Sequence, residues 1–103
     1  MIDYHVRRLL INEPLIDTIC QRFSMTEFHT EEVKRLYYKA LQKYLTQGRK
    51  FELNIGALIY YIKKRDKEPI TMKTIGTKLN EDVKLLFKTY KKMRREMRLL
   101  LRR

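Results

Sequence analysis

The fold of this chain is decided by residues 53–62, which read LNIGALIYYI. Apolar side chains fill almost every position, so a helix built from this stretch must be packed by neighbours on several sides. A short apolar run is also typical of a buried strand. We favour a central helix over about residues 52–65, because Gly56 and Ala57 allow another helix to approach closely and no other stretch supplies a sheet.

Apolar residues spaced three and four apart predict a helix before this one, over about residues 13–24. Asn12 is a suitable N-cap for it, with Pro14 in the first turn. Residues 1–11 form either a short helix or an arm.

A second helix is predicted over about residues 30–47, capped by Thr30 and stopped by Gly48. Its apolar stripe consists of Val33, Leu36, Tyr37, Ala40, Leu41, Tyr44 and Leu45. We expect Tyr37, Tyr44 and Tyr60 to pack in the core with their hydroxyls at its rim.

Two further helices are predicted after a charged loop at residues 63–69. Thr71 caps a short helix over 72–79, Asn80 suits a tight turn, and the last helix starts near Glu81 and continues toward the chain end. The inner stripe of that helix consists of Val83, Leu86, Phe87, Tyr90, Met93, Met97, Leu100 and Leu101. The pattern therefore predicts an all-α domain of five helices with a central third helix and a C-terminal helix-turn-helix-like pair.

Positive charge is concentrated at one end of the chain. The formal net charge is +12, and residues 63–103 carry fifteen Lys and Arg against five Asp and Glu. Clustered cations attract polyanions and release counterions when they meet phosphates. We expect duplex DNA as the partner, with a nucleic-acid-binding site made of Lys73, Lys78, Lys84, Lys88, Lys91, Lys92 and Arg95.

The order of short motifs from residue 48 to residue 91 resembles a known domain. Gly48-Arg49 precedes the central helix with its Gly56-Ala57-Leu58-Ile59-Tyr60, and then come Thr71-Met72-Lys73-Thr74-Ile75-Gly76 and Tyr90-Lys91. This set resembles the cyclin-like repeat of transcription factor IIB, and its second repeat more than its first. We therefore expect a single domain over 1–103, with the repeat at 12–93, the N-terminal arm or helix at 1–11 and a basic amphipathic helical extension at 94–103.

The resemblance implies a transcription factor or regulator whose last two helices contact promoter DNA and which also binds the TATA-binding protein. The sequence departs from the family in having one repeat and no zinc ribbon. The family often places Thr and Arg where this chain has Leu85 and Phe87, and Glu81 and Asp82 put negative charge where phosphates would lie. These departures favour contacts with the DNA backbone over base-specific ones. The small size favours an accessory protein or an antagonist, as viruses or reduced genomes encode.

The extension from residue 94 continues the apolar stripe and has three interpretations. It is a longer core helix, a seam for a partner or a homodimer formed by Met93, Met97, Leu100 and Leu101, or an amphipathic helix on a membrane surface. The seam favours a second function, a cyclin-like protein-interaction adapter that docks or dimerises through its C-terminal helix. A basic RNA-binding helical protein is a third.

The sequence offers no motif typical of an enzyme, because it has no phosphate-cradling loop, no paired carboxylates in a glycine-rich loop and no nucleophile beside a base. We expect no cofactor, no metal site and no catalytic residue. Cys20 is the only cysteine, so a buried structural thiol and an intracellular location, nuclear in a eukaryotic host, are predicted. No stretch is apolar enough for a signal peptide or a membrane span, and we expect no membrane partner.

Overall fold

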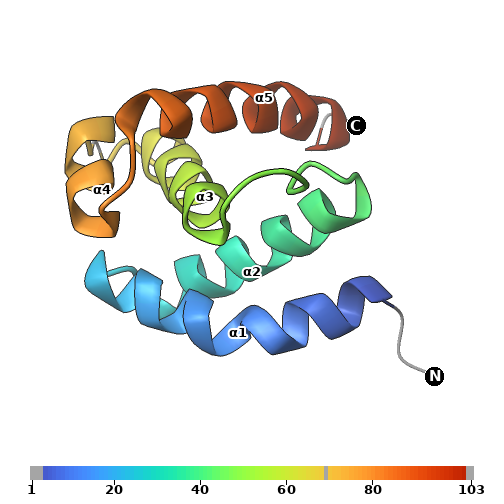
Figure 1. Ribbon diagram of the computed structural model, residues 1–103. Helices are drawn as coiled ribbons and strands as arrows, with labels where there is room; N and C mark the ends of the chain where they lie inside the picture. The colour runs from blue at the N-terminus through green and yellow to red at the C-terminus, as the bar shows by residue number, and fades with distance from the viewer. Residues whose placement is uncertain (1–3, 69, 102–103) are drawn as a thin grey trace.

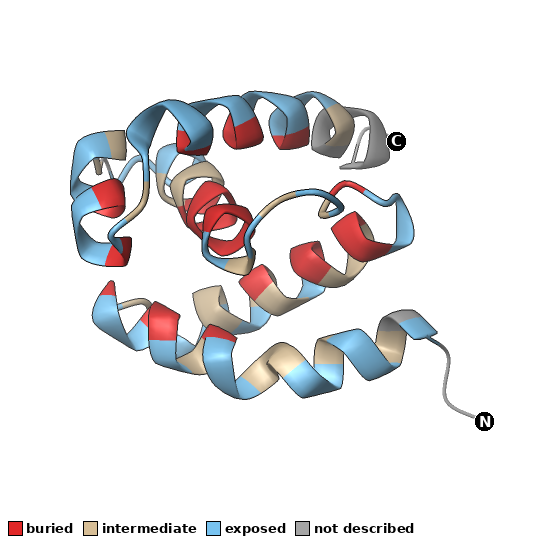
Figure 2. Cartoon of the chain, in the orientation of Figure 1, coloured by how far each residue is buried: buried red, intermediate tan, exposed pale blue. Residues whose placement is uncertain are grey.

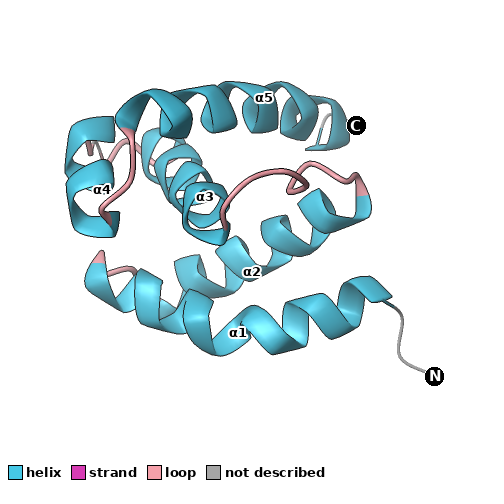
Figure 3. Ribbon diagram, in the orientation of Figure 1, coloured by secondary structure: helices cyan, strands magenta, loops and turns pink. Residues whose placement is uncertain are grey.

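The computed structural model describes residues 4–68 and 70–101, and the side chains of all of these except 5 and 97–101. The described residues form five helices and no strand (Figure 3): α1 (Tyr4–Arg22), α2 (Glu27–Gln42), α3 (Phe51–Arg65), α4 (Met72–Leu79) and α5 (Val83–Leu101). The all-α fold with five helices is therefore confirmed. In Figure 1, α1 and α2 pack together on one side of α3, α5 packs on the other side, and α4 closes one end.

The third helix is the centre of the fold, as its composition predicts. It contacts each of the other four helices, and Figure 2 shows buried residues along most of its length. A Cβ on Gly56 would lie 2.9 Å from Cδ1 of Leu79 and 3.0 Å from Cδ1 of Leu86, so the missing side chain leaves room for these leucines of α4 and α5 against α3. Both the helical prediction for this stretch and the role of Gly56 are confirmed.

The first helix is longer than the sequence suggested. It starts at Tyr4 instead of near residue 13, and Pro14 lies inside it. Asn12 is therefore not an N-cap; its side-chain amide donates instead to the Tyr37 hydroxyl at 3.0 Å. Leu9 packs against the core, which gives the first half of α1 a tertiary contact that outweighs the unfavourable proline.

The second helix begins and ends earlier than predicted. Thr26, not Thr30, is the N-cap, and its hydroxyl accepts from the His29 amide at 3.1 Å. The helix ends at Gln42, several residues before Gly48. Tyr44 follows with φ 57° and is 60% exposed, so its predicted place in the core is wrong.

Four of the five helices end with the same backbone device. The left-handed residues Ser24, Tyr44, Lys67 and Asn80 follow α1, α2, α3 and α4, and after each one the next amide donates to a carbonyl five residues earlier. The predicted left-handed turn at Asn80 is confirmed. The predicted cap at Thr71 is confirmed too, because its hydroxyl accepts from the Thr74 amide at 3.0 Å.

The core contains the lone thiol and most of the predicted apolar stripes. Cys20 is 1% exposed, and this burial raises the pKa of its thiol to about 11. Tyr37 is 2% exposed and Tyr60 is half-buried with its ring edge-on to Tyr90, so core packing of these two predicted tyrosines is confirmed. The thiol is held protonated at neutral pH, which suits a structural role.

Candidate nucleic-acid interface

The turn between α4 and α5 is fixed by a few close backbone contacts. Asn80 has φ 56° and ψ 49°, and the Glu81 amide donates to the Gly76 carbonyl at 2.9 Å. A Cβ on Gly76 would lie 2.9 Å from Cγ2 of Val83 and 3.0 Å from the Glu81 carbonyl oxygen. The absence of a side chain at Gly76 therefore lets the first turn of α5 pack directly on α4.

The fifth helix has a buried face and an opposite charged face. Its buried residues are Leu86, Thr89, Tyr90 and Met93. Successive residues of a helix are rotated by about 100°, so spacings of four and three stay on one face. The face opposite the buried residues carries Lys84, Lys88, Lys91 and Arg95.

These four residues, which we call the cationic ridge, are all exposed. None of them forms an ion pair with another residue in the part of the chain that the structure describes. Their charges are therefore not offset by fixed acidic partners. A row of exposed cations along one helix is able to contact a line of phosphates.

The other three cations predicted for the site lie elsewhere. Lys92 is exposed beside the ridge, and Lys73 is exposed on α4. Lys78 donates to the Arg22 carbonyl at 3.1 Å and lies 5.3 Å from the ring centroid of Phe23, so it is held against the end of α1. The structure thus gathers four of the seven predicted residues on one ridge and places Lys92 next to them.

A groove beside the ridge adds two cations that the sequence reasoning missed. It has a volume of about 470 Å³ and is lined by Gln47, Gly48, Arg49, Lys50, Leu53, Leu85, Lys88 and Thr89. Arg49 donates to the Leu45 carbonyl at 3.3 Å, which holds its guanidinium at the groove. The signal in the sequence is the pair Arg49-Lys50 directly before the central helix, but only the fold brings this pair to α5.

The two acidic residues directly before α5 already have partners within the protein. Glu81 lies 3.6 Å from Nζ of Lys50, and an oxygen of Asp82 accepts from the Lys84 amide at 2.7 Å. A carboxylate at a helix N-terminus interacts favourably with the helix dipole. The negative charge of Glu81 and Asp82, which the sequence analysis expected where phosphates would lie, is therefore partly compensated within the protein.

The start of α5 also exposes apolar side chains. Val83 and Phe87 were predicted to face inward, but they are 39% and 48% exposed. The prediction was wrong because the helix buries a narrower stripe, centred on Leu86 and Tyr90. Leu85 is 46% exposed, so apolar surface lies on both sides of the cationic ridge.

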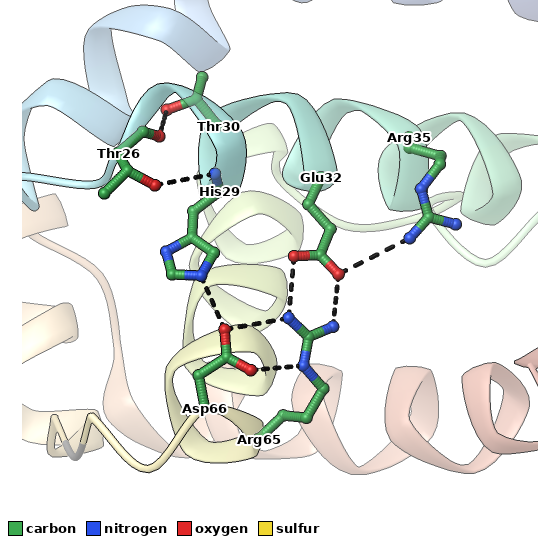
Figure 4. Close-up of polar contacts among 7 residues, drawn as sticks. All are labelled: Thr26, His29, Thr30, Glu32, Arg35, Arg65 and Asp66. Carbon is green, nitrogen blue, oxygen red and sulfur yellow. Dashed lines mark hydrogen bonds and ion pairs between the residues drawn. The ribbon is translucent and has the colours of Figure 1, made fainter.

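Figure 4 shows a separate polar cluster that joins the start of α2 to the end of α3. Arg65 donates to both carboxylate oxygens of Glu32 and to both of Asp66, and Nε2 of His29 lies 2.7 Å from Asp66. The guanidinium of Arg65 lowers the pKa of Asp66 to about 2 and also lowers the pKa of Glu32. Oxygen and imidazole ligands for a metal do meet here, but Arg65 already forms ion pairs with both carboxylates, so the contacts shown are those of an ion-pair network.

The predicted partner seam is only partly within the described structure. Met93 is 2% exposed and belongs to the core, so its side chain is not open to a partner in the single chain. The side chains of Met97, Leu100 and Leu101 lie outside the described residues. Among the helices that the structure describes, none has the length and apolar character needed to cross a membrane.

Comparison of the chain with protein-family models, with curated proteins and with solved structures finds no match in any of the three.

Proposed function

We propose that this protein binds duplex DNA through α4, the turn at Asn80 and α5, as a transcription factor IIB-like protein or transcription regulator. The observation that carries the proposal is the cationic ridge, with four exposed cations on one face of α5 and no acidic partner among the described residues. In a helix-turn-helix the second helix enters the major groove while the first crosses the backbone.

The ridge suits contacts with the DNA backbone. The twelve residues from Lys84 to Arg95 span roughly 16 Å at the rise of an α-helix. Cations along this length neutralise several phosphates and release their counterions, which supplies affinity without reading sequence. Arg49 and Lys50, beside Lys88 in the groove, extend the same basic surface.

The transcriptional part of the proposal is supported by the order of the helices. Five helices with a central third one, Gly76 at the α4–α5 contact and Tyr90 in the last helix suit the cyclin-like repeat that the sequence resembles. The TATA-binding protein is the protein partner that this resemblance suggests. The proposed role requires neither catalysis nor a cofactor, and it places the protein inside the cell, in the nucleus of a eukaryotic host.

The test is a binding titration against a random 24-base-pair duplex and a promoter-like duplex across a salt series. The variant Lys84→Gln/Lys88→Gln/Lys91→Gln removes three charges from the ridge, and the control Arg22→Gln/Lys39→Gln/Lys43→Gln removes three from α1, α2 and the residue directly after α2. We expect wild type and control to bind with a steep salt dependence and the ridge variant to bind weakly with a shallower slope. Equal loss in both variants would show that net charge alone, not the ridge, drives binding.

A second function, the protein-interaction adapter, is favoured by a different surface. Leu10, Ile11 and Leu15 of α1 are each at least half exposed, at 50%, 64% and 53%. Exposed apolar side chains gathered on one helix mark a surface for another protein. In the same titration, an adapter would show no duplex binding above about 100 mM salt and no effect of the ridge variant.

Tighter binding to a duplex of RNA than to a duplex of DNA would favour the RNA-binding alternative.

A further inference from the structure

Phe87 is an exposed aromatic residue on the helix proposed to enter DNA. It lies in the second turn of α5 and is 48% exposed, while its neighbour Leu86 is fully buried. Nζ of Lys91 lies 5.3 Å from the centroid of the Phe87 ring, so the ring adjoins the cationic ridge. The core does not account for this phenyl group, because the buried stripe of the helix passes beside it.

We propose that Phe87 contacts the 5-methyl group of thymine in the major groove. This inference rests on the proposed function and deepens it, since it assigns a base contact to a surface that otherwise binds phosphates. The first turns of a recognition helix approach the base edges, and the thymine methyl is the one apolar group that those edges present in the major groove. If Lys84 and Lys91 contact the phosphates, the apolar ring beside Lys91 is the group left to meet a base edge.

Leu85 is the other exposed apolar side chain near the ridge, and its surroundings differ. It lines the groove that also contains Arg49, Lys50 and Lys88, so its surroundings are basic. Phe87 does not line that groove. Its ring lies next to Lys91, a lysine of the cationic ridge. A flat apolar ring flanked by a cation complements a methyl group next to the phosphate backbone, so the assignment falls on Phe87.

The experiment uses two 24-base-pair duplexes, alternating d(A-T) and alternating d(A-U), which differ only in the 5-methyl group. Wild type, Phe87→Ala and Phe28→Ala are titrated against both at one salt concentration. Phe28 is a matched control, because it is an aromatic residue on α2 that is 72% exposed. Far-UV circular dichroism checks that each variant is folded, and Phe87→Leu provides a second variant that keeps an apolar side chain.

We expect wild type and Phe28→Ala to bind the thymine duplex about fourfold more tightly than the uracil duplex, the ratio for burying one methyl group. Phe87→Ala should bind both duplexes equally, with the wild-type salt dependence, and Phe87→Leu should keep part of the preference. The assignment of Phe87 is overturned if wild type binds the thymine and uracil duplexes equally, or if Phe87→Ala still binds the thymine duplex more tightly. If binding also fails to depend on the ridge lysines, the proposed function itself fails, so the two failures are distinguishable.

Discussion

Single residues in the left-handed region end four helices of this protein, and three of them are not glycine or asparagine. Ser24, Tyr44 and Lys67 have φ values of 53°, 57° and 58°. The left-handed region costs an L-residue about 1–2 kcal/mol because its Cβ crowds the following carbonyl oxygen. The turn at Tyr44 returns the chain to the core, because Leu45, directly after it, is 5% exposed.

Lys67→Gly should therefore stabilise the protein. The substitution removes the left-handed strain, and the greater freedom of glycine in the unfolded chain offsets part of the gain, which leaves a net of about 0.5–1 kcal/mol. The measurement is the free energy of unfolding in urea. Lys64→Gly, inside α3, is the control and should lower stability by a similar amount, because glycine is unfavourable within a helix. If both substitutions destabilise, Lys67 is not strained.

These residues also show why helix ends were harder to predict than helices. Asn80 was predicted as a turn because asparagine tolerates left-handed angles, whereas Tyr44 and Lys67 carry no such signal. Gly48 does have a positive φ of 75°, but it lies in the loop after α2 and does not end that helix. The end of α2 coincides with the return of Leu45 to the core, which is a property of the whole fold.

At the scale of elements, the apolar periodicity of α2, α4 and α5 was enough to predict that each helix exists, whereas α3 is apolar at almost every position and was predicted from Gly56-Ala57 and from the lack of any other stretch that supplies a sheet. For α1 the local signals were misleading, since Asn12 and Pro14 together suggested a helix start in the middle of a continuous helix. The cationic ridge was predictable because its residues belong to one helix. The groove beside the ridge was not predictable, because Arg49 and Lys50 approach Lys88 only after α3 packs on α5.

The ion-pair network at Arg65 should make the α2–α3 junction sensitive to acid. Asp66 and Glu32 have pKa values lowered from 3.8 and 4.5, so their contribution to stability is fully present above those values and is lost as pH falls through the lowered ones. Arg65→Met should therefore reduce thermal stability at pH 6, and the difference from wild type should shrink as pH is lowered toward 2. Arg22→Met, which removes an exposed arginine outside the network, is the control. A difference that stays constant with pH would mean that Arg65 acts through packing of its aliphatic chain.

At the scale of the whole molecule, the distribution of charge is unfavourable for the stability of the folded protein. The chain has a formal net charge of +12, and its α5 places like charges at spacings of three and four. Such neighbours repel by about 0.2–0.5 kcal/mol per pair in an isolated helix. A surface that is unfavourable for folding and lacks fixed acidic partners is more readily explained by a polyanionic ligand than by a structural role.

Salt should therefore raise the stability of the free protein while it weakens binding to DNA. Raising NaCl from about 20 to 500 mM shortens the Debye length from roughly 20 Å to about 4 Å, so repulsion within the ridge is screened and the melting temperature should rise. Lys84→Gln/Lys88→Gln/Lys91→Gln should melt higher than wild type at low salt and respond less to added salt, since glutamine has a helix propensity close to that of lysine. A low-salt melting temperature that falls in this variant would mean that the ridge lysines stabilise the fold, and the argument that they are held for a ligand would fail. Together with the duplex titration, this measurement separates a ridge that destabilises the free protein and binds DNA from an ordinary solvated face, which would show neither effect.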